Sequence, residues 1–433
     1  MTANSLHRRS FLRTLAAGAA GASLLRPFEA AAEAVRTQAE SIAFRGDSND
    51  SVHALAERYM LDPNILYVNH ASIGTMPRAV HVARVSYLAL CEENPWLYMW
   101  GGAWEQARED ARTALAEMLG AVPGNMAITH NTTEGFNLLA AGLPLGPGDE
   151  VLYTSLNHDG GSVCFDHWSE RRGYTVREVD FPLASSQDVT AESLIEFHRN
   201  AIRPNTRVLV LPHIDNMVGL RAPLAEICAM AHQEGVEFVA VDGAQTAGMI
   251  PLDLDASGVD AYAGSPHKWL QAPKGLGLLY LRPSLQEQLD PMWMTWGQAR
   301  WSDSVRRFED YGTRNLAETV ALNDALTFQR ALDEDQKQIR LRATWQRLYD
   351  RVDSTGKLLW RSPRRWEDSG ALVGVEVVGA AAPEVGSRLQ TEHGVIMRNF
   401  GGTALNTVRI SPHVINTDEE LDRLCDLLEA SAP

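Results

Sequence analysis

A carboxylate and a lysine follow two apolar segments of the sequence and could do chemistry together. Asp242 comes directly after the apolar run 236–241, and Lys268 lies in Gly264–Trp269, just before the glycine-spaced run 275–281. Because ligands of an open α/β sheet bind at the carboxyl ends of its strands, we expect both side chains at that edge. A lysine amine there can form an imine and then move protons, once burial and cationic neighbours such as His267 lower its pKa from about 10.4.

A second segment has the features of a phosphate site. Thr132 and Thr133 follow a short strand-like run at 126–128 and open an apolar helical stretch at 136–141. Backbone N–H groups and the dipole at a helix N-terminus bind a phosphate dianion, and threonine hydroxyls add donors. The alternative is that Asn131 and Thr132 only cap this helix. The sequence has neither GxGxxG nor GxxxxGK[ST], which argues against dinucleotide and nucleoside triphosphate sites.

An imine-forming lysine, a strand-end carboxylate and a phosphate site together predict pyridoxal 5′-phosphate (PLP) as cofactor. The carboxylate would hold the pyridine nitrogen protonated, so that the ring can accept the electrons of a carbanion at Cα of an amine substrate. Taken alone, Lys268 could be a solvated surface lysine and Asp242 a helix N-cap. Their order along the chain and their shared position at strand ends favour the PLP interpretation.

The elements that must position these residues follow an alternating pattern. Short apolar runs bounded by Gly, Pro or Asp occupy residues 151–153, 208–211, 236–241 and 276–281, and amphipathic stretches such as 191–200 and 223–234 lie between them. This pattern predicts an α/β domain with a mainly parallel sheet covered by helices on both faces. A long helical pattern over 316–352 then leads to possible strands at 372–378, 395–397 and 408–410, which predict a smaller C-terminal α+β domain.

The N-terminus has the pattern of an export signal. Arg8-Arg9 precede the small apolar run Thr14–Leu25, and Ala30–Ala32 offers a cleavage region. Paired arginines indicate the twin-arginine (Tat) route, which predicts the Tat export machinery as a partner and a periplasmic or secreted protein. The alternative is a basic tail before an apolar helix. We therefore divide the chain into a twin-arginine signal peptide (1–34), an N-terminal linker and segment (35–75), a large PLP-binding domain (76–312) and a small C-terminal domain (313–433).

Composition narrows the classes of partner. The chain has 433 residues, 45% of them hydrophobic, and a net charge of −16 without a basic run beyond the N-terminus, which argues against nucleic-acid binding. Past the N-terminus no apolar run approaches the roughly 20 residues of a spanning helix, so we expect no stable membrane anchor. The four cysteines form no CxxC pair, which argues against a zinc site or a disulfide framework, and we expect no metal.

The segments Val241–Gln245 and Ser265–Lys268 are similar to motifs of the class V aminotransferases, and the similarity covers nearly the whole chain after the signal. The resemblance implies a fold-type I PLP-dependent transferase, with a large-domain sheet of the seven-stranded type. It also implies that Lys268 carries the cofactor as a Schiff base, that Asp242 pairs with the pyridine nitrogen, and that His158 stacks on the ring. Further cofactor contacts implied in this way are Thr132, Thr133, Asn216, Gln245, Ser265 and His267.

Three further positions follow from the same resemblance. Arg409 matches the arginine that clamps a substrate carboxylate, although it could instead be a strand arginine in an ion pair. Asn69, in Leu66–Gly74, is implied as a second substrate contact. Thr313, in Gly312–Asn315, looks like the residue that reaches the cofactor phosphate of a neighbouring subunit, which implies a homodimer.

The resemblance leaves the reaction open. Within the family the chain looks most like isopenicillin-N-epimerase-like proteins, and its signal adds a similarity to the exported type that tailors the siderophore pyoverdine. Transamination, epimerisation, elimination of a sulfur group and oxidative decarboxylation with dioxygen all fit, on a small-molecule or peptide amine. The stretch Gly394–Ser411 lacks the nucleophilic cysteine of desulfurases. A further alternative is that the protein binds an amine without turning it over. The aromatic segment Asn94–Trp104 predicts either a wall of the substrate pocket or a patch at the dimer interface.

Overall fold

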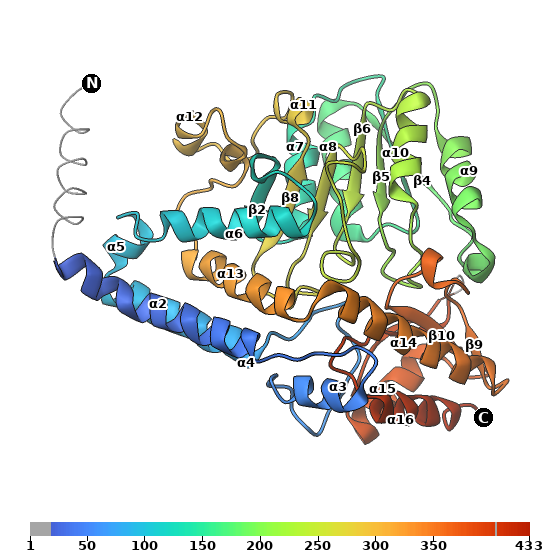
Figure 1. The fold of residues 1–433 in the computed structure, drawn as a ribbon. Helices are drawn as coiled ribbons and strands as arrows, with labels where there is room; N and C mark the ends of the chain where they lie inside the picture. Colours follow the sequence, from blue (N-terminus) through green and yellow to red (C-terminus); the bar gives the residue numbers. More distant parts are fainter. Residues whose placement is uncertain (1–18, 403–404) are drawn as a thin grey trace.

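The computed structural model describes residues 19–402 and 405–433, and a seven-stranded sheet forms the centre of its larger part (Figure 1). Strand β8 runs antiparallel to both of its neighbours, and the other strands pair in parallel. The strands lie in the order β2 (Met126–Thr129), β8 (Gly277–Leu281), β7 (Ala261–Gly264), β6 (Phe238–Asp242), β5 (Thr206–Pro212), β3 (Glu150–Thr154) and β4 (Thr175–Val179). The expected α/β architecture is confirmed, with one antiparallel strand.

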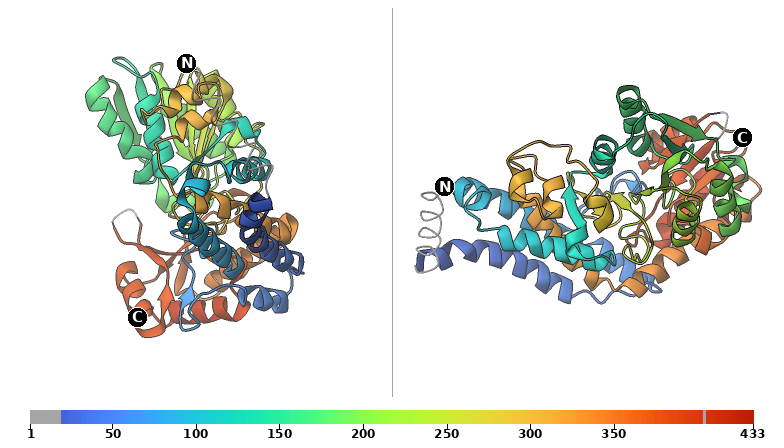
Figure 2. Two further views of the ribbon diagram at one scale, coloured as in Figure 1. Left: turned by 90° about the vertical axis from the view of Figure 1, so that its left-hand side faces the viewer. Right: turned by 90° about the horizontal axis from the view of Figure 1, so that it is seen from above.

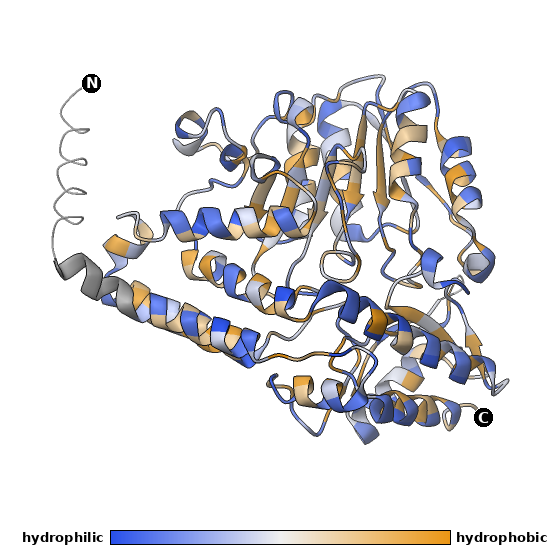
Figure 3. Ribbon diagram, viewed as in Figure 1, coloured by the Kyte–Doolittle hydropathy of each residue, from blue (hydrophilic) through white to orange (hydrophobic). Residues whose placement is uncertain are grey.

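Helices cover both faces of this sheet, which explains its continuous apolar strands. In β5, Val208 and Val210 pack into one core cluster, whereas Leu209 and Leu211 pack into another on the opposite face. Alternate residues of a strand point to opposite faces, so a strand covered on both sides must be apolar throughout. Figure 3 shows these strands as the most hydrophobic part of the molecule. The covering helices include α6 (Glu105–Met118), α7 (Thr132–Gly142), α8 (Asp159–Arg172), α9 (Ala191–Ala201) and α10 (Leu224–Gln233).

A second, four-stranded antiparallel sheet lies in the C-terminal part, below the large sheet in the left view of Figure 2. Its order is β12 (Arg398–Phe400), β13 (Thr407–Ile410), β10 (Val373–Val377) and β9 (Leu358–Trp360), and it packs with α15 (Ala382–His393) and α16 (Asp418–Glu429) around its own core. The short strand β1 (Leu66–Tyr67) pairs in parallel with β11 (Val395–Ile396). The N-terminal segment is thereby joined to the C-terminal part.

The long helical pattern over 316–352 is two helices rather than one. Helix α13 (Leu316–Ala331) ends before Asp333, and α14 (Glu334–Asp353) begins after it. Asp333 has φ 60°, in the left-handed region, and its side chain accepts the backbone N–H of Gln336, so it caps α14. No Gly or Pro marks this break, which is why helical periodicity alone did not predict it.

The segment 35–75, predicted to begin as a linker, begins instead as part of a helix. Helix α2 (Ala19–Glu40) runs through Glu40 and lies along α4 (Arg78–Glu93) and α13 (Figure 1), and α3 (Asn49–Ala56) follows it. Val35 and Ala39 are buried, and the Phe28 ring lies 5.2 Å from that of Tyr87. The polar composition of the segment hid the helical spacing of its few apolar residues. The paired arginines Arg8-Arg9 lie outside the described residues.

The docking of α2 gives a stability prediction. We compare a chain that begins at residue 33, after Ala30–Ala32, with one that begins at Phe28. The shorter chain should have a free energy of unfolding about 2 kcal/mol lower, because it lacks the partly buried Phe28 ring. Urea denaturation of both chains measures the difference. The Phe28→Ala variant should show most of the loss and Glu29→Ala, which removes an exposed side chain, almost none; equal stability of the two chains would mean that the packing of Phe28 contributes nothing.

The remaining short elements connect these layers. The helical turns α5 (Pro95–Met99) and α12 (Gly297–Arg300) lie to the left of the large sheet in Figure 1, and a third, α11 (Pro283–Gln286), lies above its strands near α7. The 3-10 turns are Pro123–Asn125, Leu183–Asp188, Val305–Phe308 and Trp366–Asp368. Among the described helices, none combines the length and the apolar character that crossing a bilayer requires.

Candidate active site

Two adjoining cavities lie where the carboxyl ends of β3, β5 and β6 meet the small sheet. The smaller, of about 260 Å³, is lined by Thr132, Thr133, His158, Asn216, Asp242, Gln245, Ser265, His267 and Lys268. The larger, of about 460 Å³, shares Ser72, His158, Asn216, Gln245 and Lys268 with it and adds Arg409. The structure thus brings together residues that are up to 337 positions apart in the sequence, as for the Arg409–Ser72 pair. Of the predicted site residues, only Asn69 and Thr313 line neither cavity.

Lys268 follows β7 on a turn that its own backbone closes, since its N–H donates to the Ser265 carbonyl at 3.1 Å. Burial lowers the pKa of Lys268 to about 8, Asp242 opposes that shift and Arg409 adds to it. The expectation that His267 is a cationic neighbour was wrong. Burial, with Lys268 beside it, lowers the pKa of His267 to about 4, so its ring is neutral and Arg409 is the cation that acts on Lys268.

Asp242 ends β6 as a buried carboxylate with one oxygen committed. Its Oδ1 accepts the Ala244 N–H at 2.8 Å, and Oδ2 has no hydrogen-bond partner among the residues that the structure describes. Burial raises the pKa of Asp242, and the charge of Lys268, the Ala244 N–H and His158 each counteract this. A cationic N–H donor is the partner that such a carboxylate lacks.

The N-terminus of α7 forms a set of donors beside Ser265. The Thr132 hydroxyl lies 2.7 Å from the Ser265 hydroxyl, and the Thr132 N–H donates to the latter at 3.2 Å. Asn131 caps the helix by accepting the Glu134 N–H, so the capping interpretation holds for Asn131. Within the described chain the Thr133 N–H has no partner, nor has the buried His267 Nδ1, which can donate only when the ring carries a proton there. A phosphate, which only accepts hydrogen bonds, fits such a group of donors.

Small residues make room beside this donor set. A Cβ at Gly160, the second residue of α8, would lie 2.7 Å from the Thr133 hydroxyl, so only glycine leaves that hydroxyl free. The Gly160 N–H donates to His158 Nδ1 at 3.0 Å, so Nδ1 is the accepting nitrogen and the contact fixes the ring at the cavity wall. The predicted stacking of His158 stays a prediction.

Gln245 is held in one orientation by two neighbours. The Trp269 indole N–H donates to its Oε1 at 2.9 Å, and its Nε2 donates to the Ala71 carbonyl at 3.0 Å. Because an indole only donates, the amide cannot be flipped, and one Nε2 hydrogen remains for the cavity. A hydroxyl or phenolate oxygen is the acceptor that this hydrogen would take. The Asn216 side chain lines both cavities, while its carbonyl accepts a hydrogen bond from Arg409.

Arg409 enters the larger cavity on neutral partners alone. Its guanidinium donates to the Asn216 carbonyl at 2.8 Å, Asn69 Oδ1 at 2.9 Å and the Ser72 hydroxyl at 2.6 Å. It forms no ion pair in the described chain, so the alternative of a strand arginine in a salt bridge is wrong. Asn69 therefore contacts Arg409 rather than the cavity, and a carboxylate is the ligand that this buried cation lacks.

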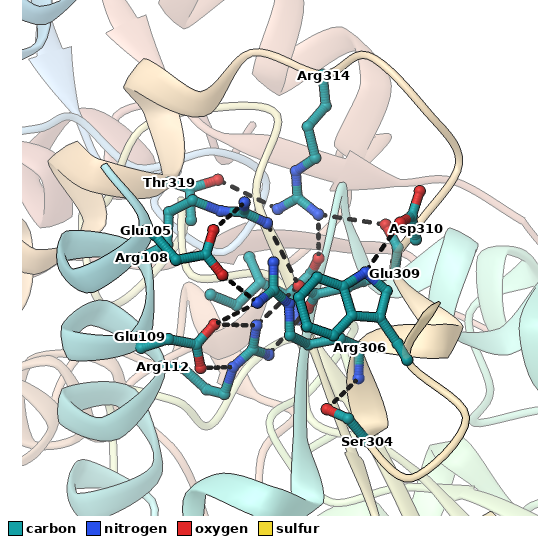
Figure 4. A network of polar contacts seen from close by, with 12 residues as sticks. Glu105, Arg108, Glu109, Arg112, Ser304, Arg306, Glu309, Asp310, Arg314 and Thr319 are labelled. Atoms are coloured by element: carbon teal, nitrogen blue, oxygen red, sulfur yellow. Dashed lines mark hydrogen bonds and ion pairs between the residues drawn. The ribbon is translucent and has the colours of Figure 1, made fainter. Parts of the chain in front are cut away.

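Thr313 lies in a separate cavity of about 120 Å³ with Trp100, Trp104 and Arg108. Figure 4 shows the ionic network beside it, in which Glu309 accepts hydrogen bonds from Arg112 at 2.7 and 2.9 Å. Burial raises the pKa of Glu309, but Arg112, Arg314 and Arg108 outweigh this effect and hold the pKa at about 2. The network fixes the segment that carries Thr313, and the aromatic segment 94–104 does not wall the Lys268 cavities of its own subunit.

Sequence reasoning missed several residues that shape the site. Ser72 accepts a hydrogen bond from Arg409, and Trp269 donates one to Gln245. The Gly74 N–H donates to the His267 carbonyl at 2.9 Å. A Cβ at Gly74 would lie 2.1 Å from the Lys268 carbonyl, so this close approach requires glycine. The polar residues within Leu66–Gly74 were the available signal for this segment.

The residues present fit PLP. A half-buried lysine shares the cavity with a carboxylate that has a free oxygen, and the unpaired Thr133 N–H lies at the same cavity. PLP, when bound, supplies an electron sink for a carbanion at Cα. Lys268 would bind the aldehyde carbon of PLP, and Asp242 would keep its ring nitrogen protonated. The residues that would bind its phosphate are Thr132, Thr133, Ser265 and His267.

The pKa of Lys268 predicts how PLP capture depends on pH. Only the neutral amine is nucleophilic, and a pKa lowered to about 8 means that the neutral fraction rises as pH increases to 8 and levels above it. The rate at which the apoprotein takes up PLP should therefore rise about tenfold per pH unit below 8 and then flatten. Stopped-flow absorbance measures this profile, and a midpoint near 10 would contradict the buried environment of Lys268.

Comparison with known proteins identifies the relatives of this chain. The sequence model described as "Aminotransferase class-V" matches residues 67–424. Isopenicillin N epimerase of Streptomyces clavuligerus is 31% identical over 86% of this chain and 96% of its own, and a cysteine desulfurase of Haloferax volcanii is 28% identical over 85% and 89%. A solved structure of the cystine C-S lyase C-DES, in complex with its product cysteine persulfide, superposes with a TM-score of 0.78 at 25% identity, over 86% of this chain and 99% of its own. The chain is therefore a member of the class V aminotransferase family of PLP enzymes.

Proposed function

We propose that this protein is an exported PLP enzyme that acts at Cα of an amino acid or of a peptide-borne amine, by transamination or a related tailoring reaction. The observation that carries the proposal is the meeting of Lys268, Asp242 and Arg409 around two adjoining cavities. Lys268 supplies the amine and the proton carrier, Asp242 the partner of the ring nitrogen, and Arg409 the cation for a carboxylate.

Epimerisation or C–S bond cleavage on the same residues is the alternative. Relatives with both kinds of name support it, since the chain resembles isopenicillin N epimerase and the cystine C-S lyase. None of Cys91, Cys164, Cys228 and Cys425 lines either cavity, which argues against a mechanism that uses a cysteine nucleophile. An elimination needs only the base and the electron sink, and stays open.

Export and dimerisation belong to the same proposal. The paired arginines Arg8-Arg9 support the twin-arginine route and a periplasmic or secreted protein. A homodimer would bring the Thr313 segment to the phosphate of the partner subunit, and the ionic network around Glu309 would hold that segment in place.

Trapping and isotope exchange test the proposal. The purified protein should absorb in the visible range, and borohydride should fix PLP on the peptide that contains Lys268. Incubation with amino acids in D₂O should then exchange the Cα hydrogen of at least one of them; keto acid, inverted Cα or released sulfur assigns the reaction. A colourless protein that takes up no added PLP would overturn the enzyme assignment.

A further inference from the structure

Two arginines lie directly opposite each other on neighbouring strands at the larger cavity. Arg398 of β12 pairs in register with Arg409 of β13, so both side chains lie on the same face of the small sheet. Both line the cavity that also contains Lys268. Phe400, two residues after Arg398 and on the same face, lies 5.8 Å from the Arg398 guanidinium and 5.9 Å from that of Arg409. The two cations therefore flank one aromatic ring at the cavity wall.

In the described chain no acidic side chain forms an ion pair or a hydrogen bond with either arginine, and Asp215 acts on Arg409 only at longer range. Arg409 donates only to neutral groups, and its buried Nε has no partner. Arg398 forms neither a hydrogen bond nor an ion pair with any described residue. Burial lowers the pKa of Arg409, and the charge of Arg398 adds to this effect. Like charges directly opposite on neighbouring strands destabilise a sheet, so this arrangement calls for anions between or beside the two side chains.

The other side of the same cavity is acidic. Asp159 begins α8 and Glu178 belongs to β4, and both line the cavity from the large sheet. Burial, together with Asp180, Asp166 and Asp159, raises the pKa of Glu178, which means that these carboxylates already repel one another. A second anion on the substrate is therefore excluded from that side and attracted to Arg398.

We infer that Arg398 binds a second carboxylate of the substrate, while Arg409 binds the first. This inference rests on the proposed function and names its substrate class, an amine that carries two carboxylates. The second carboxylate can belong to the side chain of a free amino acid or to the far end of a larger molecule, because a guanidinium recognises the same group in either.

Calorimetric titration of the PLP-loaded enzyme with pairs of equal chain length tests the inference. Succinate is compared with butyrate, glutarate with valerate, and adipate with hexanoate. At least one dicarboxylate should bind about tenfold or more tightly than its monocarboxylate, which is the scale of one charge-assisted contact. Arg398→Ala should remove that preference and leave monocarboxylate binding unchanged, Arg398→Lys should keep part of it, and Arg388→Ala, an exposed arginine of α15 away from the cavity, should keep all of it.

Three outcomes would overturn the inference: equal binding of mono- and dicarboxylates by the unmodified enzyme, no binding of either, or loss of both in Arg398→Ala. The visible spectrum of PLP on Lys268 and the melting temperature show whether each variant is folded and loaded. The proposed function fails separately, through a colourless protein or the absence of Cα exchange. Amino-terminal blocked peptides that end in a dicarboxylic residue, titrated next to the free acids, distinguish the two sources of the second carboxylate.

Discussion

Lys268→Ala should abolish turnover, by about a thousandfold or more, together with the visible absorbance of the lysine-bound cofactor. The variant loses both the amine that forms the covalent link and the group that moves protons at Cα. The half-buried side chain lies at the junction of two cavities, and no other described lysine lines either of them. Absorbance after addition of PLP, borohydride trapping and a turnover assay measure the effect.

Lys274→Ala is the matched control, because this exposed lysine lies six positions further along and outside both cavities. It should keep colour, trapping and turnover. Full turnover in a protein without Lys268 would disprove the assignment of this residue. A folded variant that binds PLP without colour and is partly rescued by added methylamine would agree with it, since a free amine can replace the missing one.

Asp242→Asn should lower turnover roughly a hundredfold while the protein keeps its colour. The amide oxygen can still accept the Ala244 N–H, so the local backbone should hold. The amide nitrogen then occupies the position of Oδ2, where it cannot hold a proton on the pyridine nitrogen, and the electron sink is weakened. Asp242 is buried, and burial raises its pKa. The expected loss of turnover therefore reflects the missing partner of the ring nitrogen rather than a change in the net charge of the protein.

Turnover and the visible spectrum, recorded together, separate this effect from loss of cofactor. Asp110→Asn is the control, since Asp110 is exposed on α6 and accepts a hydrogen bond from Gln106, away from both cavities. Unchanged turnover in Asp242→Asn would show that the ring nitrogen does not need a negative partner. Simultaneous loss of colour and activity would instead make Asp242 a binding residue.

The residues at strand ends could be predicted because a simple rule places them. Asp242 follows a continuous apolar strand, and Lys268 lies in the turn between β7 and β8, so the geometry of an open sheet brings them to one edge. Trp269 and Ser72 could not be predicted in the same way. Their roles depend on Gln245 and Arg409, which are distant in sequence, and no local pattern encodes such a contact.

Errors in the predicted elements have equally local causes. Helix α2 was taken as a linker from residue 35 because Val35 and Ala39 are its only buried side chains within 35–40. The break at Asp333 has no breaker residue, and strand β7 consists of three small residues and one tyrosine, Ala-Tyr-Ala-Gly, which give no strand signal. The charge state of His267 depended on its burial, which the sequence does not contain.

The pairing of β1 with β11 sets the order in which the site can form during synthesis. Leu66 pairs with Val395, and Asn69 and Ser72 contact Arg409, so the Arg409 side of the cavity cannot form until almost the whole chain has left the ribosome. Contacts of such long sequence separation form late and slowly, and they leave the unpaired N-terminal segment exposed in the meantime. A nascent chain can complete the large sheet first, but Arg409 can join the cavity only after strand β13 has been synthesised. The proposed twin-arginine export, which accepts folded proteins, would suit a protein whose site is completed this late.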